Sequence, residues 1–352
     1  MPAPPFQTTT RRLVLRRPTE ADRDFHSTVH SDPRLYTHAP HVLGTPETNA
    51  EFLARILRHW DEHGFGYWVA QDRESGMPVG WVGVQRGDAY LNLYYRFVLE
   101  AQGRGLAREA GRAAVAMATE WGPDLPVRAL VKEHNTASVR TALASGLART
   151  GREVVLADDR PDEALSLVFE APRVERVDLL DAATREDLVD LWQRVNDAGG
   201  AVGFLPGAPR EDVAAVVARH EEQMAAGNAV AGALRDPDGE LVGWAWWVRP
   251  ENPLLHHGRW LYRLMVDPDR QGRGLGLVLM AGLHRLARQE GAELLQLSVR
   301  SGSGASRLYR QVGYVEVGRI PGAIRVGAGD DRDDVTMARR VDGGPLVAHG
   351  GD

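Results

Sequence analysis

A six-residue segment that contains two glycines occurs twice in this chain, and each copy leads directly into an amphipathic stretch. The copies are residues 102–107 (QGRGLA) and 271–276 (QGRGLG), and each follows an apolar stretch, residues 91–98 and 261–266. The first N–H groups of a helix have no partner within the helix, and the helix dipole adds partial positive charge there. Glycines let the backbone approach a bulky diphosphate. The sequence therefore predicts a strand, a glycine turn and a helix in each half, forming two sites for a phosphate-bearing cofactor.

The two halves of the chain repeat with a nearly constant offset. The glycine turns lie 169 residues apart, and Gly146 and Gly313, which follow later in each half, lie 167 apart. The Gly-Trp pairs that begin at Gly80 and Gly243 lie 163 residues apart. Such offsets indicate a duplicated domain and not a solenoid of short repeats, and 352 residues suffice for two ordinary domains. We predict domains over residues 10–171 and 174–341, with a linker near residues 171–173.

The positions that follow each glycine turn narrow the type of cofactor. A dinucleotide-binding fingerprint requires a third Gly or Ala three residues after the second Gly, where this chain has Arg108 and Leu277. A phosphate-binding loop of the Walker type requires Gly-Lys-Ser/Thr, which neither copy contains. The spacing Gln/Arg-x-x-Gly-x-Gly/Ala resembles the acetyl-CoA signature of the GNAT N-acetyltransferases. Taken alone, one such copy is also compatible with a simple strand-to-helix turn.

Further segments strengthen the resemblance to the GNAT family. Residues 264–268 (LMVDP) are similar to the family's strand with a splayed end, and residues 305–314 are similar to its late motif around Leu-Tyr and Gly-Phe. In the first half, residues 134–138 (HNTAS) resemble the Asn-x-x-Ser form of ribosomal-protein N-terminal acetyltransferases. The tandem arrangement is also similar to that of mycothiol synthases, although no motif is specific to them. The resemblance covers residues 10–341.

The resemblance implies two mixed α/β domains, each a central twisted sheet flanked by helices, in an acyltransferase that moves acetyl from acetyl-CoA directly to an amine. It implies that the thiolate proton comes from Tyr309 in the second domain and from Ser138 in the first. The alternatives are a ring that packs on the sheet for Tyr309, and a helix cap or pantetheine contact for Ser138. The implied cofactor contacts are Met265, Val266, Gln271, Gly272, Arg273, Gly274, Leu275 and Gly276, together with Gln102, Gly103, Arg104, Gly105, Leu106, Ala107 and Asn135.

The general base is where the chain departs from the family pattern. Many members carry a glutamate on the strand before the glycine turn, whereas residues 91–98 and 260–266 contain no carboxylate. The alternatives are His256 and His257, which precede the second strand, or an amine that loses its proton through ordered water. The first domain has Leu99 in place of the usual proline after the strand, while the second has Gly302 where the counterpart of Asn135 would fall. We therefore expect the C-terminal domain to be the catalytic one.

Composition limits the partners. The chain has no cysteine, so acetyl cannot pass through a cysteine-bound intermediate. The net charge is −6 without a basic block, the longest apolar run is too short to span a bilayer, and the N-terminus has no signal-peptide core. We expect a cytoplasmic monomer or homodimer that binds acetyl-CoA and a small-molecule or peptide amine, with a mild preference for cationic amines, and no nucleic acid, membrane or metal. The main alternative is a non-enzymatic protein that binds or senses acyl-CoA.

Hydrophobic periodicity predicts the elements around these motifs. Helices are expected over residues 47–63, 106–121, 137–145, 185–195, 212–225, 275–286 and 305–312, and strands over 67–70, 79–85, 127–131 and 294–299. Residues 12–16 alternate as an edge strand would. A strand with large apolar side chains is indicated by Trp244, Trp246 and Trp247. At least one of these tryptophans is a candidate to line an acceptor pocket.

Overall fold

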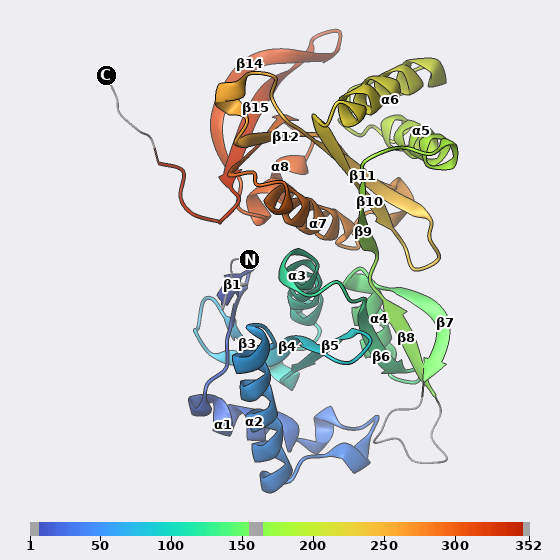
Figure 1. The fold of residues 1–352 in the computed structure, drawn as a ribbon. Coiled ribbons are helices and arrows are strands. Elements are labelled where there is room, and N and C mark those ends of the chain that lie inside the picture. Colours follow the sequence, from blue (N-terminus) through green and yellow to red (C-terminus); the bar gives the residue numbers. More distant parts are fainter. Residues whose placement is uncertain (1–6, 155–164, 348–352) are drawn as a thin grey trace. The chain divides into compact units, whose positions relative to one another are not determined.

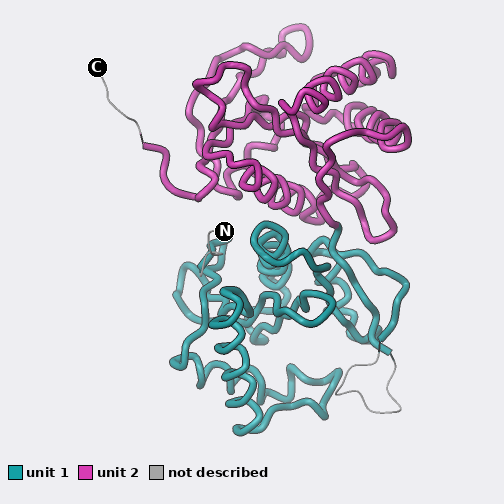
Figure 2. Tube along the Cα trace, in the orientation of Figure 1, with its two compact units in different colours: residues 1–172 teal, residues 173–352 magenta. Residues whose placement is uncertain are grey.

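The computed structural model describes residues 7–154 and 165–347 of the chain. The chain divides into two compact units, Met1–Pro172 and Arg173–Asp352 (Figure 2). Each unit is a sheet with helices packed against it (Figure 1), so the predicted mixed α/β fold with two tandem domains is confirmed.

The first domain has an eight-stranded sheet in the order β1-β2-β3-β4-β5-β6-β8-β7. Because β1 pairs with β2, the segment expected to be an edge strand is an inner strand. The strands are β1 (Gln7–Thr9), β2 (Leu13–Arg16), β3 (Tyr67–Asp72), β4 (Pro78–Arg86), β5 (Leu91–Phe97), β6 (Val127–Lys132), β7 (Ala148–Val154) and β8 (Ser166–Glu170). The helices are α1 (Arg23–His30), α2 (Pro46–His63), α3 (Leu106–Trp121) and α4 (Thr136–Ala144).

The second domain repeats this order in a seven-stranded sheet, β9-β10-β11-β12-β13-β15-β14. The helices, including those expected before the glycine turn, are α5 (Ala182–Asp197), α6 (Arg210–Ala225), α7 (Leu275–Gln289) and α8 (Ala305–Gln311). The strands are β9 (Arg173–Val177), β10 (Ala229–Arg235), β11 (Leu241–Val248), β12 (Gly258–Val266), β13 (Leu294–Arg300), β14 (Val315–Gly327) and β15 (Asp330–Arg340). The long β14–β15 hairpin was not predicted.

Local sequence explains where these elements begin and end. The hydroxyl of Thr45 accepts a hydrogen bond from the backbone of Thr48 and so caps α2, which ends at Gly64 in the left-handed conformation. Between β3 and β4 the turn contains Gly76 at φ 71°. In β11 the three tryptophans are all fully buried, with Trp244 and Trp246 in the core against α5 and α6.

In the middle of each sheet two parallel strands are paired over only part of their length. Strands β5 and β6 are paired only at Leu91 with Val127 and at Asn92 with Arg128. Strands β12 and β13 are paired from Gly258 to Leu261. The other strand pairs of the described residues are antiparallel. Beyond these short ladders the parallel strands diverge, which leaves backbone groups of β5 and β12 free to pair with an extended ligand.

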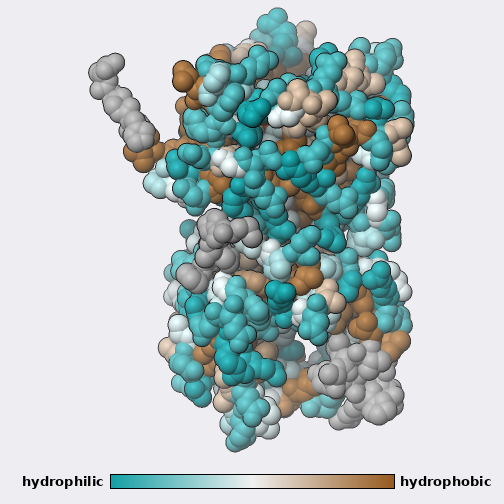
Figure 3. Space-filling model, viewed as in Figure 1, coloured by the Kyte–Doolittle hydropathy of each residue, from teal (hydrophilic) through white to brown (hydrophobic). Residues whose placement is uncertain are grey.

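Polar residues dominate one face of the molecule. The face drawn in Figure 3 is predominantly hydrophilic, with hydrophobic residues in small separate groups. Among the helices of residues 7–154 and 165–347, none combines the length and the apolar character needed to cross a membrane.

Candidate functional site

Both glycine turns adopt a backbone conformation that selects glycine. Gly103 and Gly105 have φ 70° and 74°, and Gly272 and Gly274 have φ 75° and 94°. Gly105 and Gly274 are the N-caps of α3 and α7. A Cβ at Gly103 or Gly272 would meet no atom within 4 Å, so the space above each turn is open. The first N–H groups of both helices therefore face room for an anion.

The glutamine of each turn fastens the turn to the preceding strand. The side-chain amide of Gln102 donates to the backbone oxygen of Phe97 at 3.1 Å. In the second domain Gln271 donates to the backbone oxygen of Val266 at 3.0 Å. The two bonds are equivalent in the repeat, so the glutamine holds the turn at a fixed distance from the strand end.

The small residue after each pair of glycines is explained by close packing in the second domain. A Cβ at Gly276 would lie 3.1 Å from Cδ2 of Leu308, which comes from α8. That distance is tighter than ordinary van der Waals contact, so a larger side chain would displace α8 from the turn. The first domain accommodates Ala107 at this position.

An additional, partly buried network supports the first turn. Arg12 donates to the backbone oxygen of Arg104 at 2.7 Å and forms a 2.8 Å salt bridge with Glu109 in the first turn of α3. The hydroxyl of Thr10 also donates to Glu109, at 2.6 Å. Burial acts to raise the pKa of the Glu109 carboxyl, but the hydrogen bonds from Thr10 and Arg12 together hold it below its usual value. Glu109 is therefore ionised at neutral pH and anchors strand β2 to the helix that begins at the glycine turn.

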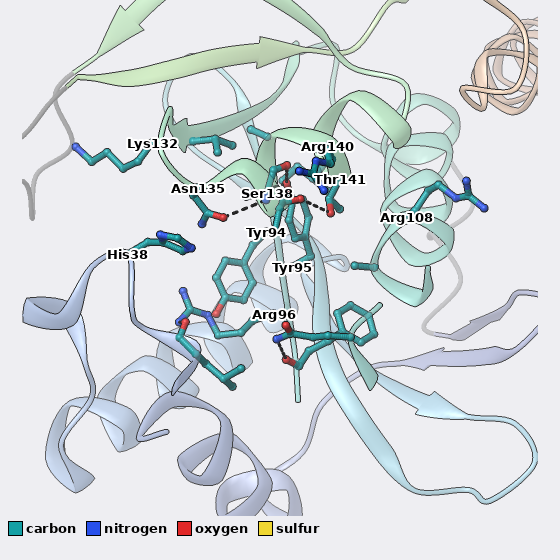
Figure 4. A pocket seen from close by; sticks show the side chains of 18 of the residues that line it. His38, Tyr94, Tyr95, Arg96, Arg108, Lys132, Asn135, Ser138, Arg140 and Thr141 are labelled. Atoms are coloured by element: carbon teal, nitrogen blue, oxygen red, sulfur yellow. Dashed lines mark hydrogen bonds between the residues drawn. The ribbon is translucent and has the colours of Figure 1, made fainter. Parts of the chain in front are cut away.

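The first domain contains a cavity of about 1040 Å³ that includes the whole glycine turn. Residues 102–107 line one part of it, and Asn135 and Ser138 of the predicted site line another (Figure 4). The structure thus brings together all of the site residues predicted in the first domain. Among the described residues the lining contains no Asp or Glu, whereas its cationic side chains are Arg34, Arg96, Arg104, Arg108, Lys132 and Arg140.

Alternation along β5 divides this cavity between two faces of the sheet. Tyr95 points toward α4, where its hydroxyl lies 2.9 Å from Oγ of Ser138. Tyr94 points the other way, toward α1, where its hydroxyl lies 2.9 Å from Nε2 of His30. Arg96 lies on the Tyr94 side, as Figure 4 shows. The cavity reaches both faces because β5 and β6 diverge between them.

The predicted acid of the first domain is part of a hydroxyl pair. Tyr95 also donates to the backbone oxygen of Ser138 at 2.9 Å. Burial raises the pKa of Tyr95 to about 12, so its phenol is protonated at neutral pH. The helix-cap alternative considered for Ser138 belongs to Asn135 instead, whose side chain accepts from the Ser138 N–H at 3.1 Å. The Ser138 hydroxyl is thus available to the cavity and is backed by a neutral phenol.

The predicted acid of the second domain is enclosed. Tyr309 on α8 is 7% exposed, and its ring packs edge-on against Tyr314 with centroids 6.0 Å apart. Burial raises the pKa of its phenol, which is therefore protonated at neutral pH. Within residues 7–154 and 165–347 its hydroxyl makes no hydrogen bond. A free, protonated hydroxyl is what a proton donor requires.

The strand that carries Met265 and Val266 has an irregularity that its first-domain counterpart lacks. The β11–β12 register shifts between Trp244 and Trp246, and Arg263 within the bulge has φ 55°. The Arg263 guanidinium is directed at α5, with Cζ 5.6 Å from the centroid of the Trp192 ring. A second cavity, of about 230 Å³, is lined by Gly199, Gly200, Phe204, Leu205, Pro206, Arg300, Ser301, Gly302, Val326, Asp330 and Arg332. This cavity does not include residues 271–276.

The histidines considered as alternative bases lie far from the second glycine turn, and Trp247 is a core residue. His256 and His257 are exposed and precede β12, at the end of the strand opposite to the glycine turn. An extended strand rises about 3.3 Å per residue, so His257, nine residues before Val266, lies roughly 30 Å from it. Trp247 donates its indole N–H to the backbone oxygen of Leu283 at 2.7 Å, which makes it a core residue under α7.

Sequence reasoning missed Tyr95 and the cationic side chains outside the glycine turn. The signal for Tyr95 was present, because alternation along residues 91–97 places Leu93, Tyr95 and Phe97 on one face. The role of Arg96, Arg108 and Arg140 depends on which segments face the cavity, and that follows from tertiary packing.

Comparison with known proteins identifies both halves of the chain. Two models described as acetyltransferase (GNAT) domain match residues 12–148 and 209–321. A mycothiol acetyltransferase from Saccharomonospora viridis is 37% identical over 138 residues, which cover 32% of this chain. The match spans 45% of that relative's length, somewhat less than half.

Solved structures resemble this chain over about half of its length. An acetyltransferase from Agrobacterium tumefaciens is 23% identical, with a TM-score of 0.39, over 47% of this chain and 92% of its own. An acetyltransferase of the GNAT family from Bacillus anthracis is 17% identical, with a TM-score of 0.40, over 47% of this chain and 96% of its own.

Proposed function

Because this chain belongs to the GNAT acetyltransferase family, we propose that it transfers an acetyl group from acetyl-CoA directly to an amine. The observation that carries the proposal is the first-domain cavity, which joins an anion-binding glycine turn to a hydroxyl pair beside an opened sheet. The chain contains no cysteine, so no cysteine-bound acetyl intermediate is available.

The cofactor is placed by the backbone of the first domain. The N–H groups at the start of α3 bind the diphosphate, with Gly103 and Gly105 leaving room for it. Arg108 and Arg140 line the same cavity and supply positive charge for the phosphates. The pantetheine arm follows the diverging edge of β5, where backbone groups beyond Asn92 are not paired with β6.

Transfer requires one bond to form and one to break. The nitrogen lone pair of the amine attacks the thioester carbonyl, the carbon–sulfur bond breaks, and the thiolate accepts a proton. We assign that proton to Ser138, with Tyr95 behind it. None of the described residues that line the cavity carries a carboxylate that would remove the proton of the amine. The amine therefore loses its proton to water, and the rate rises with pH until the amine is neutral.

The second domain has its own glycine turn and its own candidate proton donor. There we propose that Met265, Val266 and residues 271–276 bind a second acetyl-CoA and that Tyr309 supplies the proton. The expectation that this C-terminal domain is the catalytic one stays a prediction. The geometry supports the first domain, because its glycine turn and its hydroxyl pair line one cavity.

The test combines binding with turnover. Isothermal titration with CoA counts the binding events per chain, and release of free thiol from acetyl-CoA is followed with a panel of amines. Acetylated amine in the mass spectrum supports the proposal. Tight CoA binding with no acetylation of any amine would instead support a protein that binds or senses acyl-CoA.

A second candidate reaction is favoured by one relative. The 37% identity to a mycothiol acetyltransferase places acetyl transfer in mycothiol formation among the reactions to test. Adding the desacetyl form of mycothiol to the panel separates this reaction from general amine acetylation, because it would then be acetylated faster than every other amine.

A further inference from the structure

A guanidinium without a carboxylate partner lines the first-domain cavity on the face turned toward α1. Nη1 of Arg96 donates to the backbone oxygen of Leu35 at 3.3 Å, and Cζ lies 3.7 Å from the centroid of the Tyr36 ring. Nε of Arg96 is buried and has no hydrogen-bond partner. Among the described residues Arg96 forms no salt bridge. The Arg96 charge therefore has no counter-charge among the described residues, which points to an anion that arrives from outside.

The described side chains near Arg96 do not provide a negative charge to pair with its guanidinium. Arg34, the neighbouring guanidinium in the lining, is already occupied by Asp32, with Nη2 and Oδ2 2.7 Å apart. The phenol of Tyr94 also faces this side, and burial raises its pKa, so it is neutral at physiological pH. The described residues that line the cavity include no Asp or Glu, so these residues give a positive local field although the whole chain carries −6.

The chemistry of the two faces differs. Phosphate groups are expected on the α3 and α4 side, at the glycine turn with Arg108 and Arg140. Arg96 is on the opposite side of β5, so it is separated from the cofactor by the strand. A planar guanidinium that lines a cavity matches the two oxygens of a carboxylate. A bare cationic amine would instead be repelled at this position.

Resting on the proposed acetyltransferase function, we propose that the acceptor is an amine that also carries a carboxylate, such as an amino acid, and that Arg96 binds this carboxylate. Arg96 thereby determines acceptor specificity and turns the amine toward the opening between β5 and β6. The proposal replaces the mild preference for cationic amines that net charge suggested, because the charges lining the cavity decide the local field.

The experiment compares amines that differ only in the carboxylate. Phenylalanine is paired with phenethylamine and lysine with cadaverine, and kcat/KM is measured for wild type, Arg96→Gln and Arg96→Lys. In wild type we expect the acids to be preferred by about tenfold to a hundredfold, as for a hydrogen bond to a charged group. Arg96→Gln removes this preference, and Arg96→Lys keeps part of it. Arg23→Gln, which removes an exposed guanidinium paired with Glu20, is the matched control and keeps the preference.

A binding measurement separates this proposal from the function on which it rests. With CoA present, N-acetylphenylalanine is titrated into wild type and Arg96→Gln. Binding that is lost in Arg96→Gln supports the carboxylate site even if no amine is acetylated, and that second result would overturn only the acetyltransferase function. Equal kcat/KM for acids and simple amines, or equal binding by wild type and Arg96→Gln, would overturn the carboxylate site and leave acetyl transfer standing.

Discussion

The two domains share a glycine turn but surround it with different side chains. In the first domain the turn lines a cavity of about 1040 Å³. The 167-residue offset of the late motifs aligns Thr141 and Ala142 of the first domain with Leu308 and Tyr309 of the second. Leu308 packs against the second turn and Tyr309 against Tyr314. In the first domain Thr141 lines the cavity, and Ala142 is buried. The turn therefore specifies an anion-binding backbone, and the residues that face it set the volume available for a substrate.

The largest effect should come from the proton donors. We expect Ser138→Ala to lower kcat by about 10²–10⁴, the usual contribution of general acid catalysis, with CoA affinity nearly unchanged. Steady-state thiol release checks this prediction in Ser138→Ala and in Tyr309→Phe, which keeps its ring. If Tyr309→Phe loses the activity and Ser138→Ala retains it, the reaction belongs to the second domain.

The next effect concerns cofactor binding. Gly105→Asp adds a negative charge where the diphosphate must lie, and we expect CoA affinity for the first domain to fall about 100-fold. Gly105→Asn is the matched control, because it has nearly the same size and also tolerates positive φ. Titration calorimetry measures both variants, with Gly274→Asp and Gly274→Asn as the same pair in the second domain. Equal losses in Asp and Asn variants would attribute the effect to backbone geometry and not to charge.

The fold was largely predictable because duplication and periodicity are local signals. The helix over residues 47–63 became α2, and the stretch after the first glycine turn became α3. The β14–β15 hairpin was missed because the sequence of β14 is exposed almost throughout and lacks a buried face. The hairpin joins the sheet through the pairing of β15 with β13, which lies about 30 residues earlier in the chain.

The candidate site was predictable only where a motif encodes it. The glycine turns and Ser138 were found from their spacing, and the structure places the first turn and Ser138 on one cavity. No motif contains Tyr95 or Arg96, so sequence reasoning missed both. These two neighbours in β5 point to opposite faces of the sheet and meet different elements there. The role of Tyr95 depends on the side chains of α4 that it contacts, and the role of Arg96 depends on the groups on the α1 side of the sheet.

Acid should distinguish the stabilities of the two domains. Burial lowers the pKa of His26 to about 4 and of His30 to about 3 in the first domain, and of His220 to about 4 in the second. A histidine held neutral in the folded state destabilises it as the pH falls below the unfolded value near 6.5, until the folded group also protonates. From pH 7 to pH 5 each buried histidine should cost about 1–2 kcal/mol of unfolding free energy.

Among the described residues burial also lowers the pKa of His59 in the first domain. The first domain therefore has three such histidines, and it should lose more stability over this range than the second. Chemical denaturation at pH 7 and pH 5, with hydrogen exchange to resolve the two domains, checks the difference. His26→Phe should reduce the pH dependence of the first domain. An unchanged pH dependence in this variant would assign the acid sensitivity to other groups.

The smallest effect on stability and turnover should come from the side-chain cap of α4, because the matching helix of the second domain, α8, has no side-chain cap. Asn135 caps α4 through the Ser138 N–H at 3.1 Å, whereas α8 begins at Gly304, which makes no side-chain cap. Asn135→Ala should therefore lower the stability of the first domain by about 1 kcal/mol. It should also loosen the Ser138 hydroxyl, so we expect a modest fall in kcat. Asn135→Asp keeps an acceptor at the cap and should restore stability. If Asn135→Ala changes CoA affinity more than stability, Asn135 acts as a cofactor contact and the cap is secondary.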